Sequence, residues 1–304
     1  MTGKESDMDG LSDLPDHLLL HILQFMNAKY SVQTCILSKR WQNLWKILTN
    51  IELYHLDRYN NGVIFDKFVS RFLSGRDNFI PLHSISYVNG CMNYPFPPET
   101  NIPVEIMEYA ASHDVQELEI NCQSDHISNL LELPPSIFNC TYLTSLTLCL
   151  WDVSKPNIKM FPKSLNLPAL KTLKLVCFTF FTSDNGYAEP FSTCYMLNKL
   201  AIMCCQLEDD AQGLCISNSK VSNLAIGTLS HSNIHKVILC TPKLTSLTIN
   251  GTPPIFPAPY TYNLTLLEEL KFDCRFGDTM GEDILISWLY LLAKVKIMTQ
   301  FQYP

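Results

Sequence analysis

One short pattern, apolar-x-x-apolar-x-apolar, recurs along most of the 304-residue chain and constrains its fold more than any other feature. Its copies begin at Val115, Leu143, Leu170, Leu197, Val221, Leu244, Leu267 and Leu292. Successive copies are 28, 27, 27, 24, 23, 23 and 25 residues apart. Leu82, Ile85 and Tyr87 form a degenerate further copy that begins 33 residues before Val115. A pattern with this period predicts one structural unit that must stack on its neighbours to bury its apolar face.

The last two apolar residues of each copy are separated by one residue, so they point to the same face of a strand. A period of about 20 to 29 residues with this pattern is the signature of a leucine-rich repeat. The predicted fold class is therefore α/β, with a curved parallel sheet and with helices and loops on the convex side. We assign this solenoid to residues 81–304, in about eight to nine irregular repeats.

Twelve cysteines are spread along the chain, but no C-x-x-C pair occurs, so a zinc ribbon or a thioredoxin-like site is unsupported. The N-terminus is polar and lacks the apolar segment of a secretory signal. We therefore expect reduced thiols in an intracellular protein of the nucleus and/or cytoplasm. Cys122, Cys177, Cys204 and Cys274 lie two residues beyond the last apolar position of a repeat, so they are predicted to continue the inward row.

The segment before the repeats is unusually apolar. Pro15 suits the first turn of a helix, and seven of the nine residues from 18 to 26 are apolar. A helix this apolar all round cannot be explained by one packing face. A second helical stretch is predicted to begin at Ser31 as N-cap, and Trp41 and Trp45 have the i, i+4 spacing of one helix face. A unit of about forty residues cannot bury this much apolar surface alone, so it must dock on the rest of the chain or on another protein.

The runs L-P-D-x-x-L-x-x-I-L and C-I-L-S-K-R-W-x-x-L-W in residues 11–51 resemble the F-box, particularly that of plant F-box proteins. The resemblance implies a three-helix domain that binds a Skp-type adaptor and, through it, the cullin of a ubiquitin ligase. The positions that match the family motif, including its adaptor-facing surface, are Leu14, Pro15, Ile22, Leu23, Ile36, Leu37, Ser38, Lys39, Arg40 and Trp41. Trp45 is expected to be internal. The alternative is an ordinary helical bundle whose leucines and tryptophans are all core.

The rest of the N-terminal half completes the predicted domain organisation. Residues 1–10 are expected to be a disordered tail. Residues 52–80 carry apolar side chains at helical spacing and are predicted to form a helix that links the F-box to the solenoid and caps its first repeat. The order of these parts resembles plant F-box/leucine-rich-repeat proteins over essentially the whole chain. Many such proteins continue with a C-terminal module, which is expected to be absent after Pro304, leaving the last sheet edge poorly covered.

The residues that flank the central apolar position of each repeat point away from the interior and define the predicted concave face. The candidate substrate-binding residues there are Glu117, Glu119, Lys174, Lys199, Asn223, Glu269 and Lys271. No large aromatic residue occurs among the sixteen flanking positions, which also include Lys294 and Lys296. We therefore expect hydrogen bonds and charge pairs with a target protein, and loops that supply any aromatic contacts. The alternative is a sheet face that is merely solvated.

Several classes of function are disfavoured. The net charge of −7 argues against nucleic-acid binding, and the longest apolar stretch, residues 284–293, is too short to cross a membrane. His231 and His235 have the H-x-x-x-H spacing but no evident third ligand, so no metal is expected. No phosphate-binding loop, nucleophile elbow or paired carboxylates on a helix are found, so we expect neither a cofactor nor catalysis.

These inferences lead to one preferred function and two alternatives. The preferred function is the substrate-recognition subunit of a Skp–cullin–F-box ubiquitin ligase, a non-catalytic part that binds a Skp-type adaptor and an unknown protein substrate. The first alternative is a small-molecule receptor with its ligand in the concave face. The second is a leucine-rich-repeat interaction protein outside any ligase.

Overall fold

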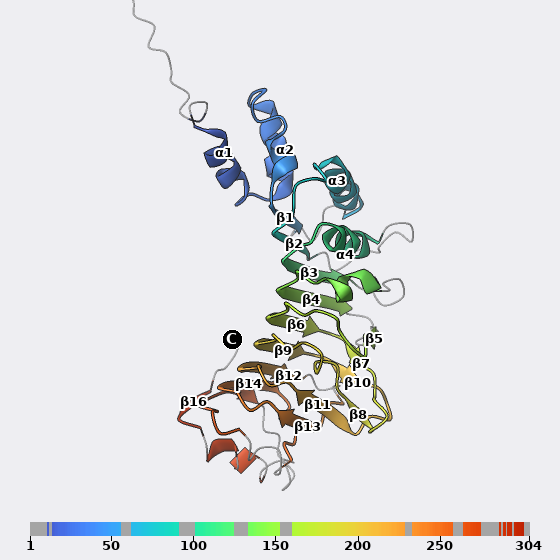
Figure 1. Cartoon of the computed structure of the whole chain (residues 1–304), viewed down its shortest axis with the longest axis vertical. Helices are drawn as coiled ribbons and strands as arrows, with labels where there is room; N and C mark the ends of the chain where they lie inside the picture. The colour runs from blue at the N-terminus through green and yellow to red at the C-terminus, as the bar shows by residue number, and fades with distance from the viewer. Residues whose placement is uncertain are drawn as a thin grey trace, which may run out of the picture.

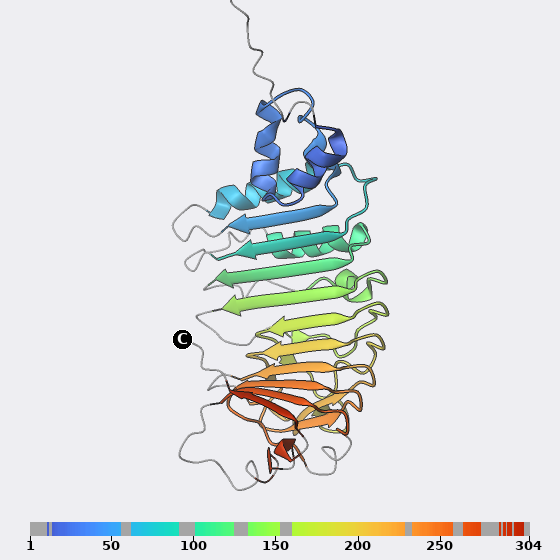
Figure 2. The same cartoon turned by 90° about the vertical axis from the view of Figure 1, so that its left-hand side faces the viewer.

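The computed structural model describes residues 11, 14–55, 62–90, 101–124, 133–152, 160–228, 233–257, 264–274, 286, 288–289, 291–293 and 295–300. Its main element is a ten-stranded sheet in which every neighbouring pair is parallel, in the order β1-β2-β3-β4-β6-β9-β12-β14-β15-β16 (Figures 1 and 2). The strands are β1 (Asn50–His55), β2 (Ser84–Asn89), β3 (Glu117–Ser124), β4 (Ser145–Asp152), β6 (Thr172–Val176), β9 (Lys199–Met203), β12 (Asn223–Gly227), β14 (Ser246–Gly251), β15 (Glu269–Cys274) and β16 (Ile297–Gln300). This arrangement is the predicted leucine-rich-repeat solenoid.

The apolar repeat becomes the interior because the strands pair in register. Leu118 of β3 pairs with Leu146 of β4, which in turn pairs with Leu173 of β6, and all three side chains are buried. The residues between them in sequence point to the other face of the sheet. Such contacts continue from repeat to repeat in one continuous core, so each repeat buries its apolar side chains against the next. The interior pattern predicted from the sequence is confirmed from the second to the ninth strand.

The sheet begins earlier than the sequence predicted. Ile51 and Leu53 of β1 pair with Ile85 and Tyr87 of β2, and all four side chains are buried. The predicted solenoid boundary at residue 81 therefore comes one strand too late. The helix predicted within 52–80 exists as α3 (Gly62–Gly75), but it connects β1 to β2 rather than the F-box to the first repeat.

The interior is closed on its second side by two kinds of structure (Figure 1). In the first repeats, α3, α4 (Ile102–Ser112) and the 3₁₀ helix η4 (Pro135–Asn139) lie there. Further along, two three-stranded sheets take their place, formed by β5 (Met160–Phe161), β7 (Thr179–Phe180) and β10 (Gln206–Leu207), and by β8 (Tyr187–Ala188), β11 (Gly213–Ser217) and β13 (Val237–Cys240). Helices and loops were predicted on this side. The short strands were not, because runs of two to five residues carry no periodicity of their own.

The predicted eighth repeat is out of register. Ile297 of β16 pairs with Glu269, and Met298 pairs with Leu270, so the repeat that was aligned at Leu292 actually begins at Val295. The predicted concave position Lys296 is therefore wrong, and Ile297 and Thr299 flank the central position of this strand instead. The predicted position Lys294 lies outside the described residues. The sequence pattern favoured the alignment at Leu292 because the observed register places the polar Gln300 at the last apolar position.

The prediction that four cysteines continue the inward row is only partly correct. Cys122 is fully buried in the interior. Cys177 and Cys204 instead have positive φ angles of 64° and 54°, which interrupt the alternation of the strand and turn their side chains toward a separate cluster. The side chain of Cys274 lies outside the described residues.

The N-terminal unit contains α1 (Asp16–Leu23), α2 (Ala28–Gln33) and the short 3₁₀ helices η1 (Thr34–Ile36) and η2 (Leu44–Ile47). The predicted third helix is thus a single 3₁₀ turn. The predicted N-cap at Ser31 is wrong, because the Asn27 side chain accepts a hydrogen bond from the Lys29 amide and caps α2. Trp41 and Trp45 do not share a helix face, because η2 begins only at residue 44.

The N-terminal unit covers the free edge of β1. The Asn27 side-chain amide donates to the Tyr54 carbonyl at 2.8 Å, and Asn27 forms a parallel bridge with Glu52. The edge that the predicted linking helix was expected to cap is therefore capped by the N-terminal unit itself.

Arg76 ties this unit to the first repeats. Its buried guanidinium donates to the Leu48 carbonyl and, at 2.9 Å, to the Tyr109 hydroxyl of α4. The guanidinium also lies 6.0 Å from the centre of the Tyr109 ring. One side chain thus connects the end of η2, the end of α3 and α4.

We predict that Arg76→Ala lowers the free energy of unfolding by about 2–4 kcal/mol, because it removes both hydrogen bonds and leaves the Leu48 carbonyl without its donor. Chemical denaturation followed by circular dichroism measures the change. Arg71→Ala, on the exposed side of α3, is the matched control and should shift it by less than about 0.5 kcal/mol. Equal effects of the two substitutions would contradict the assigned role of Arg76.

Candidate adaptor-binding surface and concave face

The N-terminal unit has a small core of its own. Leu19 and Leu23 of α1 pack with Trp41, Leu44 and Leu48, and all five side chains are buried. They come together because α1 presents residues four apart on one side, while the turn before η2 brings Trp41 back against it. Two residues of the predicted adaptor-binding set, Leu23 and Trp41, therefore belong to this core, with 0% and 4% of their surface exposed. The structure therefore corrects the prediction that Leu23 and Trp41 contact the adaptor, because both side chains are buried in this core.

Large apolar side chains remain exposed around this core. Ile36 is 87% exposed and Phe25 is 72% exposed, which is unusual for side chains of this kind. We define the F-box apolar surface as the exposed residues Leu18, Ile22, Phe25, Tyr30, Ile36 and Leu37. Burial of one such side chain on a partner contributes about 1.5–3 kcal/mol. This surface suits a protein partner.

The remaining predicted contact residues lie beside this surface. Pro15, Ser38, Lys39 and Arg40 are exposed, and Leu14 is partly buried against the small core. The Arg40 Nε donates to the Asp16 carboxylate at 2.6 Å, so the segment after η1 is held next to the start of α1. This ion pair places Leu37 and its neighbours close to α1.

Sequence reasoning did not assign Leu18, Phe25 and Tyr30 to this surface. The apolar run from 18 to 26 could have indicated this surface, because only Leu19 and Leu23 form the buried face of α1. Leu18, Ile22 and Phe25 then remain exposed to solvent. Tyr30 carried no comparable signal. Trp45, expected to be internal, is partly buried and stacks on Phe72 of α3 with 5.2 Å between ring centres.

The face of the ten-stranded sheet opposite the interior is the concave face (Figures 1 and 2). The predicted positions Glu117, Glu119, Lys174, Lys199, Asn223, Glu269 and Lys271 all occupy it, at alternate positions of their strands. Two carboxylates there have partners within the sheet. Ser86 donates to Glu119 at 2.8 Å, and Glu269 accepts from Ser246 at 2.7 Å and from Lys271 at 2.8 Å. Hydrogen bonds from Lys271 and Ser246 lower the pKa of the Glu269 carboxyl group.

The middle of the concave face is basic. Lys174 and Lys199 are exposed, and within the described part of the chain neither forms an ion pair. The four strands β6, β9, β12 and β14 carry no acidic residue. The two ammonium groups are therefore not neutralised by their own sheet.

A small apolar cluster lies on the same face beside Lys174. Cys149, Val176 and Met203 pair in register one residue beyond the inward row, and Trp151 packs against them. Burial raises the pKa of the Cys149 thiol to about 11, against the opposing effect of the Lys174 charge. An aromatic side chain is thus present on the concave face, in a row beyond the flanking positions that the sequence analysis considered.

Two further observations concern other kinds of site. No group of three or more His, Cys, Asp or Glu side chains among the described residues could hold a metal ion. His231, which the sequence analysis considered together with His235 as a metal ligand, lies outside the described residues. In the part of the chain that the structure covers, no helix has the length and apolar character needed to span a membrane.

A short helical unit with exposed apolar side chains that caps a solenoid of parallel strands is the architecture of an F-box followed by leucine-rich repeats. Comparison with known families agrees. The F-box domain matches residues 11–52, and the repeats of FBD-associated F-box protein At5g56370 match residues 104–254. The chain thus has an F-box at residues 11–52 and repeats of the FBD-associated F-box kind at residues 104–254, and it is similar to F-box/leucine-rich-repeat proteins. F-box domains generally bind Skp-type adaptors.

Its curated relatives are proteins of Arabidopsis thaliana. F-box/LRR-repeat protein 13 is 29% identical over 201 residues, which are 64% of this chain and 41% of the relative. FBD-associated F-box protein At5g60610 is 26% identical over 265 residues, or 86% of this chain and 63% of the relative. Putative F-box/FBD/LRR-repeat protein At4g26350 is 35% identical over 172 residues, or 56% and 37%. The chain thus spans less than two thirds of the length of these relatives.

We predict that Trp41→Ala lowers the free energy of unfolding of the N-terminal unit by about 3–5 kcal/mol, because it empties the small core. Ile36→Ala should change it by less than about 0.5 kcal/mol, because that side chain is exposed. Chemical denaturation, monitored by hydrogen exchange of the amides of α1, measures both changes in the free energy of unfolding. A large loss of stability in Ile36→Ala would mean that this residue is core.

Proposed function

We propose that this protein is the substrate-recognition subunit of a Skp–cullin–F-box ubiquitin ligase inside the cell, in the nucleus and/or cytoplasm. The observation that carries the proposal is the F-box apolar surface, which lies within a segment that matches the F-box family. Ile36 and Phe25 lie in water in the isolated chain, and a Skp-type adaptor is the partner that such domains generally bind. The adaptor would connect this chain to a cullin.

In this proposal the solenoid selects a target protein. The rigid, register-matched sheet holds the concave face at a fixed position relative to the adaptor-bound F-box, because Arg76 and Asn27 join the two parts. The exposed Lys174 and Lys199, which form no ion pair with the described residues, favour a target with acidic side chains, and the nearby Trp151 offers an apolar contact. The protein itself does no chemistry. Its contribution is to raise the effective concentration of the target near the ubiquitin-transferring enzyme.

The adaptor-binding part is tested by co-purification with a panel of Skp-type adaptors. We expect wild-type protein to bind and the double variant Ile36→Asp, Leu37→Asp to lose at least a hundredfold in affinity, since two charges would be buried at the interface. Both side chains are exposed, so the variant should remain folded.

Ile64→Asp is the matched control, because Ile64 is also a highly exposed apolar residue, 67% accessible, but lies on α3 outside the F-box. It should bind adaptors as wild type does. If wild-type protein binds no adaptor, or if the double variant binds as tightly as Ile64→Asp, the ligase proposal is wrong.

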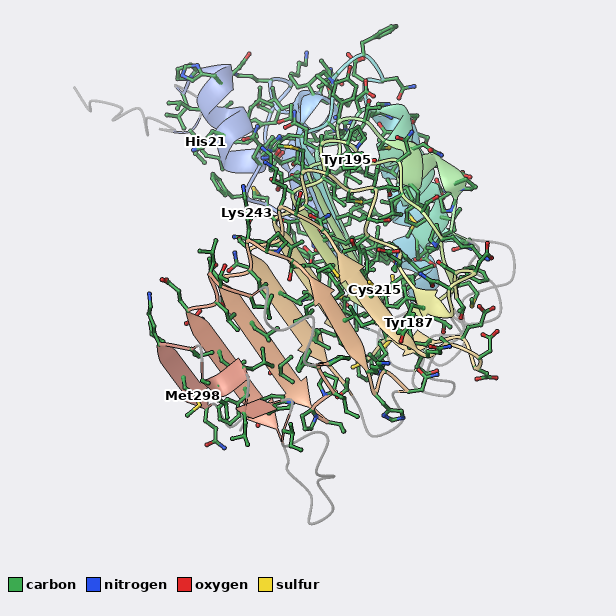
Figure 3. All side chains as sticks on the ribbon, turned by 60° about the horizontal axis from the view of Figure 1, so that its bottom comes forward. His21, Tyr187, Tyr195, Cys215, Lys243 and Met298 are labelled. Atoms are coloured by element: carbon green, nitrogen blue, oxygen red, sulfur yellow. The ribbon has the colours of Figure 1, made fainter. Side chains whose placement is uncertain are left out.

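The substrate-binding part is tested by proximity labelling in cells with the double variant Lys174→Glu, Lys199→Glu. We expect this variant to retain adaptor binding and to lose most of the proteins labelled by wild type, because the charge reversal repels acidic targets. Lys67→Glu, Lys243→Glu reverses two exposed charges elsewhere, on α3 and on the edge of the solenoid, and serves as control (Figure 3). An unchanged set of labelled proteins in the first variant would remove the concave face as the binding site.

A further inference from the structure

Two cysteines occupy equivalent places in neighbouring repeats. Cys177 follows β6 and Cys204 follows β9, directly after the paired residues Val176 and Met203. Both have left-handed backbone, with φ angles of 64° and 54°. The Cys177 amide donates to the Met203 carbonyl at 3.0 Å, and the Cys204 amide donates to the Gly227 carbonyl at 2.7 Å. The strand ladder thus continues through both residues and fixes their relative position.

The left-handed turn brings both thiols to the concave side. They belong to the cluster of Cys149, Val176 and Trp151, separate from the interior of the solenoid. Cys177 is buried, whereas Cys204 is partly exposed. Cys205, the next residue, is buried in the interior instead, where its thiol lies 3.4 Å from the Met203 carbonyl. One of two adjacent cysteines is therefore accessible and the other is not.

The two thiols interact with each other. A side-chain hydrogen bond from Cys177 lowers the pKa of the Cys204 thiol, which burial opposes. The same hydrogen bond, together with burial, raises the pKa of Cys177. Cys204 is thus the better nucleophile of the pair, because the thiolate is the reactive form, and Cys177 is the protonated neighbour.

The backbone spacing suits a covalent bond between them. Neighbouring strands lie about 4.7–4.9 Å apart, and disulfides typically join Cα atoms about 4.4–6.8 Å apart. Because the two residues directly follow the in-register pair Val176 and Met203, they need no slip of the sheet to reach each other.

We infer that Cys204 and Cys177 form an oxidation site on the concave face, in which hydrogen peroxide converts the two thiols to a cross-repeat disulfide. The Cys204 thiolate attacks one peroxide oxygen, the O–O bond breaks, and the products are a sulfenic acid and hydroxide. The Cys177 sulfur then attacks the Cys204 sulfur and displaces hydroxide, which leaves as water with the Cys177 proton. Overall, two thiols and one peroxide give one disulfide and two waters, with both sulfurs oxidised and the peroxide reduced.

A second pair of cysteines in the same chain provides a matched control. Cys215 of β11 and Cys240 of β13 are also partly exposed and hydrogen-bonded to each other, on the opposite side of the solenoid (Figure 3). Their register differs, because Cys215 pairs with Ile238 while Cys240 pairs with Ser217. Burial and the nearby Glu189 carboxylate raise the pKa of Cys215 to about 12. Cys215 should therefore react slowly.

The site adjoins the proposed substrate surface. A disulfide here would tie β6 to β9 beside Lys174 and Trp151, so target binding would depend on oxidation. Only this consequence rests on the proposed function. The thiol chemistry stands on the geometry of the pair and can be measured without a substrate or an adaptor.

The test is site-resolved mass spectrometry of the 304-residue chain, first after brief alkylation with iodoacetamide and then after treatment with hydrogen peroxide. We expect Cys204 to be alkylated at least tenfold faster than Cys215, and peroxide to produce a Cys177–Cys204 crosslink that a reducing agent reverses. In Cys177→Ser, peroxide should leave Cys204 as a sulfenic acid that a dimedone probe traps.

Alkylation of Cys204 at the rate of Cys215 would overturn the inference, as would a peroxide crosslink that joins Cys204 to a different cysteine or the absence of any crosslink. If the serine variant does not fold, the wild-type alkylation rates and crosslink decide the question on their own. If adaptor binding fails while this crosslink forms, the proposed function is wrong and the oxidation site remains.

Discussion

The structure depends on one constraint, the stacking of apolar side chains in register along a ladder of parallel strands. No single repeat can bury its own row of leucines, so each strand is stable only between its neighbours. The pairing of Leu118, Leu146 and Leu173 is repeated along the sheet and sets which residues face outward. The charges of the concave face, the sulfur cluster beside them and the position of the F-box all follow from this register.

The end strands of a stacked sheet have only one neighbouring strand, and the N-terminal end of this solenoid shows how such an edge is covered. The first strand is covered by the F-box through Asn27, and Arg76 connects the two parts from the other side. The F-box is therefore a cap, and in the proposed function it is also the domain that binds the adaptor. Leu23 and Trp41 are buried in its small core, whereas Phe25 and Ile36 are exposed. A single unit thus stabilises the sheet with one face and offers another to a partner.

The sequence predicted the features that rest on long, repeated patterns. The solenoid, the F-box at residues 11–51 and the outward direction of Lys174 and Lys199 all follow from apolar spacing or from a specific motif. Prediction from the sequence failed where a local backbone conformation overrides the repeated pattern. Left-handed backbone at Cys177 and Cys204 reverses the expected face, and the packing of Trp41 against α1 depends on a turn that has no periodicity. The register of β16 was predicted wrongly because the observed pairing places the polar Gln300 at an apolar position of the repeat.

Hydrogen exchange of the full chain, with and without a Skp-type adaptor, tests the central claim most directly. The claim is that the F-box apolar surface binds the adaptor while the solenoid keeps its concave face free. The account predicts slower exchange in α1, α2 and η1 on adaptor binding and unchanged exchange in β6, β9 and β12. Slower exchange along those three strands, with none in α1, would contradict it.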